Sequence, residues 1–146
     1  MSPMPVKVRS IHKPGLKTRT RRPLALVRIP GGFPSPAEDY LEGSLDLNRH
    51  LLKHPAATFY FRVTGDSMKD AGIHSGDLLV VDRSLEATDG SVVVAVVGGD
   101  FTVKRLRVKG GRVRLVAENP SHPPLPDPGD FKVWGVVTFC IHGVGR

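Results

Sequence analysis

Short valine-rich runs separated by glycine and aspartate dominate the chain from Thr58 onward, and this pattern constrains the fold most. β-branched residues favour strands, and Gly-containing breaks favour tight turns between them. Gly98-Gly99-Asp100 and Gly110-Gly111 predict two hairpins that share one central strand. We therefore expect a mainly β domain of twisted antiparallel strands, with strands at residues 58–63, 77–82, 91–97, 101–108, 112–116 and 131–141.

The region before these runs has a different pattern. Leucines recur at roughly helical spacing between Glu38 and His54, and Pro55 follows them. Proline cannot continue a helix, so one or two short helices are expected over this stretch. With 146 residues in all, the chain is about the size of a single domain.

Positive charge is concentrated at the N-terminus. Residues 1–28 contain no acidic side chain, and the rest of the chain holds 13 basic against 14 acidic residues. We expect residues 1–31 to form a flexible basic arm ahead of a nearly neutral domain at 32–146. The eight basic residues of the arm are Lys7, Arg9, Lys13, Lys17, Arg19, Arg21, Arg22 and Arg28.

Charge alone leaves two interpretations of the arm open, a solvated tail or a weak nonspecific contact with DNA or a partner. The arm has no long continuous apolar run, so neither a secretory signal nor a membrane span is expected. A cytoplasmic protein fits these features. The single cysteine, Cys140, excludes an internal disulfide and also fits a reducing compartment.

Two further groups of residues were considered as sites. Cys140 lies within an apolar run, which favours packing over a nucleophilic role. His50 and His54 are four residues apart on the expected helix, but no third ligand stands at a suitable spacing. Neither a metal nor another cofactor is therefore expected.

The strongest candidate chemistry involves one serine and one lysine. Ser67 follows Gly65-Asp66, which favours a tight turn that exposes the hydroxyl, and Lys104 lies within the apolar run 101–108. A serine hydroxyl needs a base to remove its proton during attack, and lysine can be that base only when neutral. About 0.04% of a lysine with an ordinary pKa is neutral at pH 7, whereas a pKa lowered by ~3 units through burial gives roughly 30%.

Strand alternation favours such burial, because it places Lys104 on the same face as Thr102 and Leu106. The backbone N–H groups of Asp66 and Ser67 are candidates for stabilising a developing oxyanion. Each motif alone is weak, since Gly-Asp-Ser occurs in ordinary turns and lysines occur on ordinary strand edges.

Taken together, three segments resemble the LexA/UmuD family of self-cleaving serine/lysine peptidases. Residues 32–40 are further similar to the segment that follows the cleavage site in the UmuD branch. The resemblance extends over residues 30–142 and implies a LexA-like C-terminal peptidase fold, with the arm removed by self-cleavage. The three segments are residues 63–73, 76–82 and 100–106.

Applied residue by residue, the resemblance implies that Ser67 is the nucleophile, Lys104 the general base and Gly31-Gly32 the scissile bond. The family usually has Ala or Cys before the cut, whereas this chain has Gly31. Glycine fits a small pocket but makes the unbound segment more flexible, so slower or differently regulated cleavage is expected.

The resemblance also implies a cellular role. The full-length form would be a homodimer that cleaves itself when RecA–DNA filaments accumulate in the SOS response. The trimmed dimer would then serve a UmuC-like error-prone polymerase in translesion synthesis. The alternative from another class is a noncatalytic β-rich interaction module whose basic arm binds DNA.

Two related classes fit the sequence less well. A LexA-type repressor would need a helix-turn-helix domain, which the short N-terminal arm is not expected to supply. A signal peptidase would need a membrane anchor, and the sequence has no suitable apolar run.

Overall fold

The computed structural model describes residues 5–15, 21–25, 41–121 and 130–145. It contains two compact units, one made of Met1–Pro14 with His54–Arg146 and the other of Gly15–Lys53. The larger unit holds both Ser67 and Lys104. No helix in the described ranges is long and apolar enough to cross a membrane.

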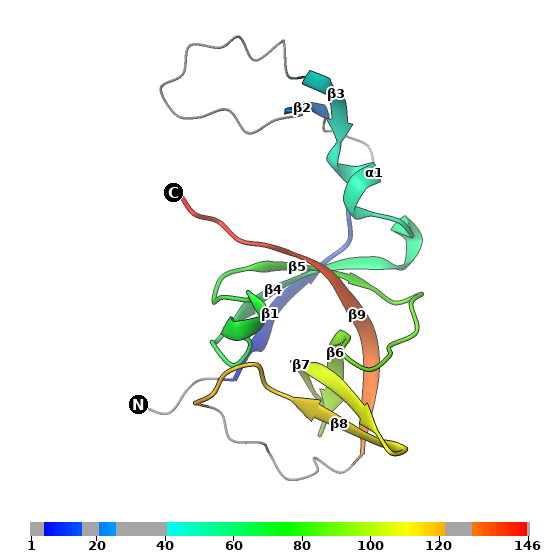
Figure 1. Cartoon of the computed structure of the whole chain (residues 1–146), viewed down its shortest axis with the longest axis vertical. Helices are drawn as coiled ribbons and strands as arrows, with labels where there is room; N and C mark the ends of the chain where they lie inside the picture. Colours follow the sequence, from blue (N-terminus) through cyan, green and yellow to red (C-terminus); the bar gives the residue numbers. More distant parts are fainter. Residues whose placement is uncertain (1–4, 16–20, 26–40, 122–129, 146) are drawn as a thin grey trace. The chain divides into compact units, whose positions relative to one another are not determined.

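The larger unit is built on a seven-stranded sheet with the order β1-β4-β5-β9-β6-β7-β8, in which neighbouring strands run antiparallel (Figure 1). The prediction of a mainly β fold is confirmed. All six strands expected after Thr58 are present, as are both hairpins. The strands are β1 (Lys7–His12), β4 (Thr58–Thr64), β5 (Leu78–Asp82), β6 (Val92–Val97), β7 (Asp100–Lys109), β8 (Arg112–Val116) and β9 (Phe131–Ile141).

One extra pairing closes this sheet on itself. Lys7 of β1 pairs with Thr102 of β7, while β1 also pairs along its length with β4. Six strands therefore form a closed ring, and β8 lies outside it on β7. Closure removes the open edges that a flat sheet would expose. The closing strand β1 was not predicted, and it belongs to the N-terminal 31 residues.

The core of the larger unit fills this ring from several strands. One buried cluster includes Val6, Phe61, Met68 and Val103, and a second consists of Val93, Ala95 and Leu106. The strand β7 contributes to both clusters, because its alternate residues face opposite sides. Its middle is consequently buried on both faces.

The smaller unit pairs β2 (Arg21–Ala25) with β3 (Leu41–Asp46) and continues into α1 (Leu47–Leu51). Asp46 caps α1 by accepting a hydrogen bond from Asn48 N at 3.0 Å. The predicted helix is thus confirmed only over α1. The helix expectation was wrong over β3, where pairing with β2 satisfies the backbone instead of a helical turn.

Candidate active site

Ser67 lies in a turn that begins where β4 ends. Gly65 adopts a φ of 102°, in the left-handed region that favours glycine, and turns the chain away from the strand. Met68 is fully buried in the core and anchors the turn, which continues into a short 3-10 helix at Lys69–Ala71. The local sequence therefore fixes Ser67 between a glycine reversal and a buried methionine.

The Ser67 side chain is buried against the N-terminal segment. The expectation that the turn exposes the hydroxyl is wrong here, because Ser67 has an exposed fraction of 0% and its Oγ accepts a hydrogen bond from Val6 N at 2.9 Å. The approach is close, since a Cβ atom on Gly65 would lie 2.2 Å from the Pro5 carbonyl oxygen. Only glycine allows the backbone of Pro5 and Val6 to come so near the turn.

Lys104 is buried in the middle of β7, with an exposed fraction of 7%. It pairs with the fully buried Val93 of β6, and Leu106 lies two residues along on the same face. Burial lowers the pKa of the Lys104 ammonium below its usual value. The direction of this shift is the one that a lysine base requires.

The strand β1 connects the surroundings of the two residues. Val6 binds the Ser67 hydroxyl, and the next residue, Lys7, pairs with Thr102 of β7. Thr102 is two positions from Lys104 on the same face, a spacing of about 7 Å along a strand. Within the described part of the chain, Ser67 Oγ and Lys104 Nζ do not hydrogen-bond each other, so their joint action belongs to the proposal below.

A second connection runs through Glu118, just beyond β8. Its carboxylate accepts a hydrogen bond from Arg105 Nε at 2.5 Å, next to Lys104 in sequence. Its backbone carbonyl accepts from Asp70 N at 2.8 Å, and the following residue, Asn119, donates from Nδ2 to the Asp66 carbonyl. These bonds hold the serine turn against the lysine strand. No sequence motif pointed to Glu118 or Val6.

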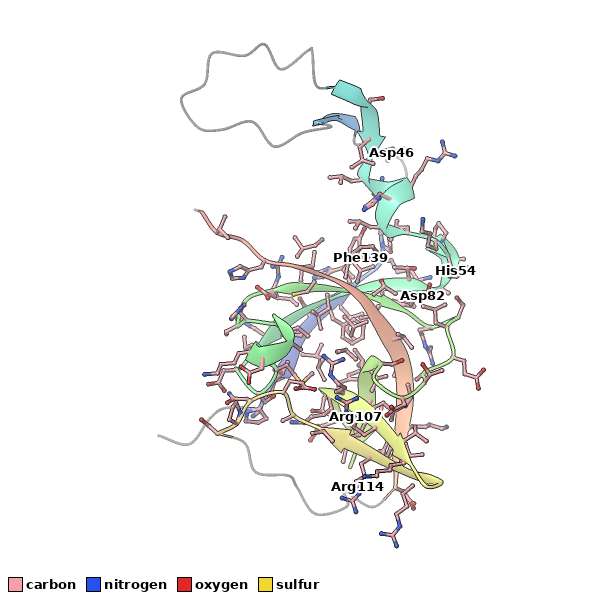
Figure 2. The ribbon with its side chains drawn as sticks, in the orientation of Figure 1. Asp46, His54, Asp82, Arg107, Arg114 and Phe139 are labelled. Atoms are coloured by element: carbon pink, nitrogen blue, oxygen red, sulfur yellow. The ribbon has the colours of Figure 1, made fainter. Side chains whose placement is uncertain are left out.

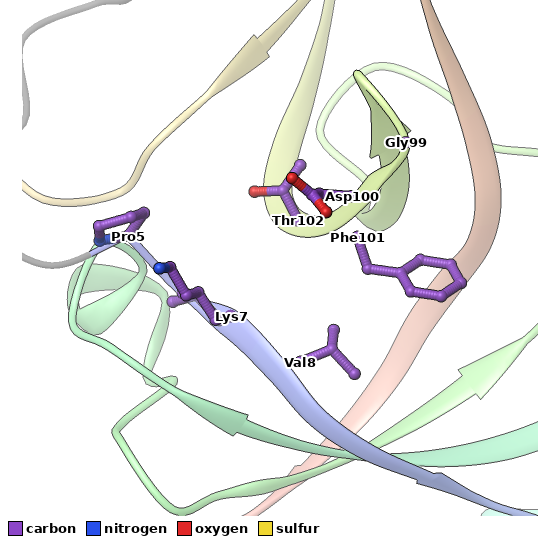
Figure 3. Close-up of a pocket in the computed structure, with 8 residues that line it drawn as sticks. Pro5, Lys7, Val8, Gly99, Asp100, Phe101 and Thr102 are labelled. Atoms are coloured by element: carbon purple, nitrogen blue, oxygen red, sulfur yellow. The ribbon is translucent and has the colours of Figure 1, made fainter.

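A cavity of about 450 Å³ opens beside the single β1–β7 pair. Its lining includes Val6 and Thr102, which are neighbours of the two candidate residues in space or sequence. Figure 3 shows Pro5, which precedes β1, and Lys7 and Val8 of β1 across from the β6–β7 turn. On that side, the lining residues are Gly99 of the turn and Asp100, Phe101 and Thr102 of β7.

Cys140 lies in a different polar cluster, around the buried carboxylate of Asp77. Its Sγ donates to Asp77 Oδ2 at 3.1 Å, and His142 Nδ1 bonds Asp77 Oδ1 at 2.5 Å. Burial, together with the hydrogen bond and negative charge of Asp77, raises the pKa of Cys140 to about 12. The thiol also packs against the main core cluster, which confirms the prediction of a packing role.

His50 and His54 do not form a metal pair. His54 Nδ1 bonds Asp82 Oδ2 at 2.6 Å, and Figure 2 shows the two side chains together. Among the residues that the structure describes, no cluster of three or more histidine, cysteine or acidic side chains is arranged to hold a metal ion.

Two predicted features of the site remain predictions. Gly31 and Gly32, the expected scissile bond, lie outside the described residues. The backbone N–H groups of Asp66 and Ser67, the expected oxyanion donors, lie in the turn after Gly65, and their role stays a prediction.

Comparison with known proteins identifies the family. Residues 23–138 match the family described as Peptidase S24-like. The chain is 51% identical to the protein SamA of Salmonella typhimurium over 120 residues, covering 82% of this chain and 84% of SamA. It is 48% identical to the protein MucA of Escherichia coli over 122 residues, covering 82% and 83% of the two chains.

A longer relative is also similar. LexA repressor 1 of Pseudomonas putida is 42% identical over 119 residues, which cover 80% of this chain and 58% of the repressor. Both the shorter relatives and the repressor therefore match over most of this chain, as the motifs around Ser67 and Lys104 implied. The chain belongs to the S24-like peptidases, the LexA/UmuD family.

Proposed function

We propose that this chain is a UmuD-like serine peptidase of the SOS response that cleaves its own Gly31-Gly32 bond. Ser67 is the nucleophile and Lys104 the general base. The trimmed product, with residues 32–146 as its peptidase domain, serves an error-prone polymerase in translesion synthesis. The observation that carries this proposal is the burial of Lys104, because a lysine base must lose its proton near neutral pH.

The reaction follows from the chemistry of the two side chains. Ser67 Oγ attacks the Gly31 carbonyl carbon while neutral Lys104 accepts the hydroxyl proton. The Gly31–Gly32 C–N bond then breaks, and Lys104 returns the proton to the departing Gly32 nitrogen. Water hydrolyses the resulting ester, with Lys104 again as base, and releases the new carboxylate. The N–H groups of Asp66 and Ser67 are proposed to stabilise the oxyanion in both steps.

Several features of the site support this assignment. The serine turn is held by a buried methionine and by two bonds to the Glu118-Asn119 segment. Burial favours the neutral form of the lysine, since it is the cause of the lowered pKa. Rigid positioning of both groups is what a nucleophile and base require.

The biological partners are proposed from family membership. We expect a homodimer whose cleavage is triggered by a RecA–DNA filament, followed by association with a UmuC-like polymerase. On this proposal the filament favours the conformation in which residues 31 and 32 reach Ser67 and supplies no catalytic group. The reaction is expected to need neither a metal nor another cofactor.

Incubation of the purified protein at mildly alkaline pH tests the proposal. Intact-mass spectrometry should detect pieces corresponding to residues 1–31 and 32–146, with Gly32 as the new N-terminus. The Ser67→Ala variant should keep its full mass under the same conditions, and circular dichroism should show that it is folded.

Continued cutting by the Ser67→Ala variant would contradict the mechanism. A wild-type chain that stays intact, both alone and with an activated RecA–DNA filament, would instead favour the noncatalytic interaction module.

A further inference from the structure

The N-terminal strand β1 is part of the peptidase body although it lies on the far side of the proposed cut. We infer that the piece containing residues 1–31 stays bound to the body after cleavage, as a separate chain that still supplies β1. This inference rests on the proposed cut at Gly31-Gly32. It assigns the groove between β4 and β7 as a binding site for an extended peptide, whose occupant is residues 5–12.

This segment pairs along β4 and places the side chain of Val6 in the core. Val6 is 1% exposed and belongs to the main core cluster with Phe61 and Val63 of β4. Its N–H is hydrogen-bonded to Ser67 Oγ, and Lys13 Nζ lies 5.0 Å from the centre of the Phe59 ring. Both ends of the segment are therefore fixed to the body.

Backbone pairing binds the segment between two strands. It pairs with β4 from Lys7 to His12 and with β7 at Lys7. Without β1, the ring of strands would open, and β4 and β7 would each expose unpaired backbone groups. An added strand satisfies such groups through main-chain hydrogen bonds, while a buried side chain such as Val6 fixes its register.

The bond that is cut is not part of β1 or of its pairing with β4 and β7. The proposed cut lies 19 residues beyond the end of β1 in the sequence, and β1 itself is part of the larger unit. Cleavage breaks one covalent connection and leaves every pairing of β1 in place. The cleaved form is thus expected to be a noncovalent complex of two chains.

Retention also changes the expected charge of the product. All eight basic residues of the N-terminal region lie before Gly31 and would stay with the body. Release would instead leave a body with 13 basic against 14 acidic residues. A retained strand therefore preserves any affinity of the N-terminal cations for DNA phosphates after the cut.

A site-specific protease tests this inference without relying on self-cleavage. Its recognition sequence is inserted between Gly31 and Gly32 of the otherwise unchanged chain, so that the Val6–Ser67 bond is preserved. After complete cutting, gel filtration in native buffer should yield both pieces in one peak, in equal amounts. Gel filtration in concentrated urea should separate them into two peaks. Separate elution in native buffer would overturn the inference.

Matched variants identify which strand holds the piece, since β2 also pairs across the cut. Val6→Asp places a charge in the core and should remove the N-terminal piece from the native peak. Arg9→Asp introduces the same side chain at the exposed bulge of β1 and should leave the piece bound. Equal retention in both variants would show that β1 does not hold the piece.

A milder change keeps the test informative if uncut Val6→Asp does not fold. Val6→Ala removes only part of the buried side chain and should release the cut piece roughly tenfold faster than the unchanged chain. An unaltered release rate would contradict the role assigned to Val6.

Discussion

Lys104 and Cys140 are both shielded from water in the same sheet, yet burial has opposite chemical consequences for them. Burial favours the neutral form of each group, so it lowers the pKa of Lys104 and raises that of Cys140 to about 12. A neutral amine is a base, whereas a neutral thiol is a poor nucleophile. One physical effect therefore prepares the first group for chemistry and disables the second.

The charged neighbours reinforce this difference. Asp77 stands 3.1 Å from the Cys140 thiol and adds to its raised pKa, while Lys104 pairs with the buried Val93 and shares its face of β7 with Leu106. An acidic group beside Lys104 would have stabilised the ammonium and opposed deprotonation. Asp77 therefore adds to the effect of burial in keeping the Cys140 thiol neutral.

The largest expected effect comes from keeping the charge at residue 104. Lys104→Arg preserves a cation that does not deprotonate in proteins, so self-cleavage should fall by roughly 10²–10⁴-fold, the typical contribution of a general base. The Lys104→Ala variant should show a similar fall in the rate of self-cleavage. Cleavage is followed by mass after incubation at alkaline pH, with urea unfolding to verify the fold. Substantial self-cleavage by a folded Lys104→Arg chain would show that a neutral lysine at this position is not the base.

A smaller effect, on stability, is expected for the buried carboxylate of Asp82, which remains charged. Burial alone would raise the pKa of Asp82, but hydrogen bonds from Ser84 and His54 outweigh it and hold the pKa below its usual value. A lowered folded-state pKa contributes stability above the unfolded pKa near 4, and this stability is lost as pH falls through the folded value. Asp82→Asn should cost about 1–3 kcal/mol at pH 7 because donors lose a charged partner.

Urea unfolding between pH 7 and pH 2 measures this contribution. The free energies of unfolding of wild type and Asp82→Asn should begin to converge as pH falls below about 4 and should meet once pH is below the lowered pKa of the folded carboxylate. If the two plots of unfolding free energy against pH stay parallel down to pH 2, the Asp82 carboxylate does not cause this pH dependence of stability.

The smallest expected effect concerns the pKa of the Cys140 thiol and its rate of alkylation. Asp77→Asn removes the negative charge beside the thiol, so the pKa of Cys140 should fall while burial still keeps it raised. Each unit of decrease raises the thiolate fraction about tenfold below the pKa, and alkylation by iodoacetamide should accelerate accordingly at pH 9. Asp82→Asn is the matched control, since Asp82 does not contact the thiol. Equal alkylation rates in the two variants would show that the charge of Asp77 does not contribute to the raised pKa of Cys140.

The sequence predicted the strands after Thr58 well, because their apolar runs are separated by turn residues that admit few other conformations. Burial of Lys104 also followed from alternation on its strand. The strand β1 could not be predicted in the same way. Its residues are largely basic or polar, and it is a strand because β4 and β7 provide unpaired backbone on both sides.

Tertiary pairing likewise decided β3, whose leucines carry a helical spacing but whose backbone pairs with β2. The hydrogen bonds by which Glu118 connects the serine turn to β7 could not be predicted from the sequence either. Its carboxylate and backbone meet Arg105 and Asp70, residues 13 and 48 positions away, and no local pattern encodes such contacts.

The pH dependence of unassisted self-cleavage tests the central claim, that a lysine made neutral by burial is the base. The rate is measured from about pH 6 to about pH 11, a range that brackets a lysine pKa lowered by burial. The account predicts a rate that rises with pH and levels off at an apparent pKa below the ordinary value of about 10.4. A flat profile in the folded protein, or a rise that continues unchanged beyond that value, would contradict it.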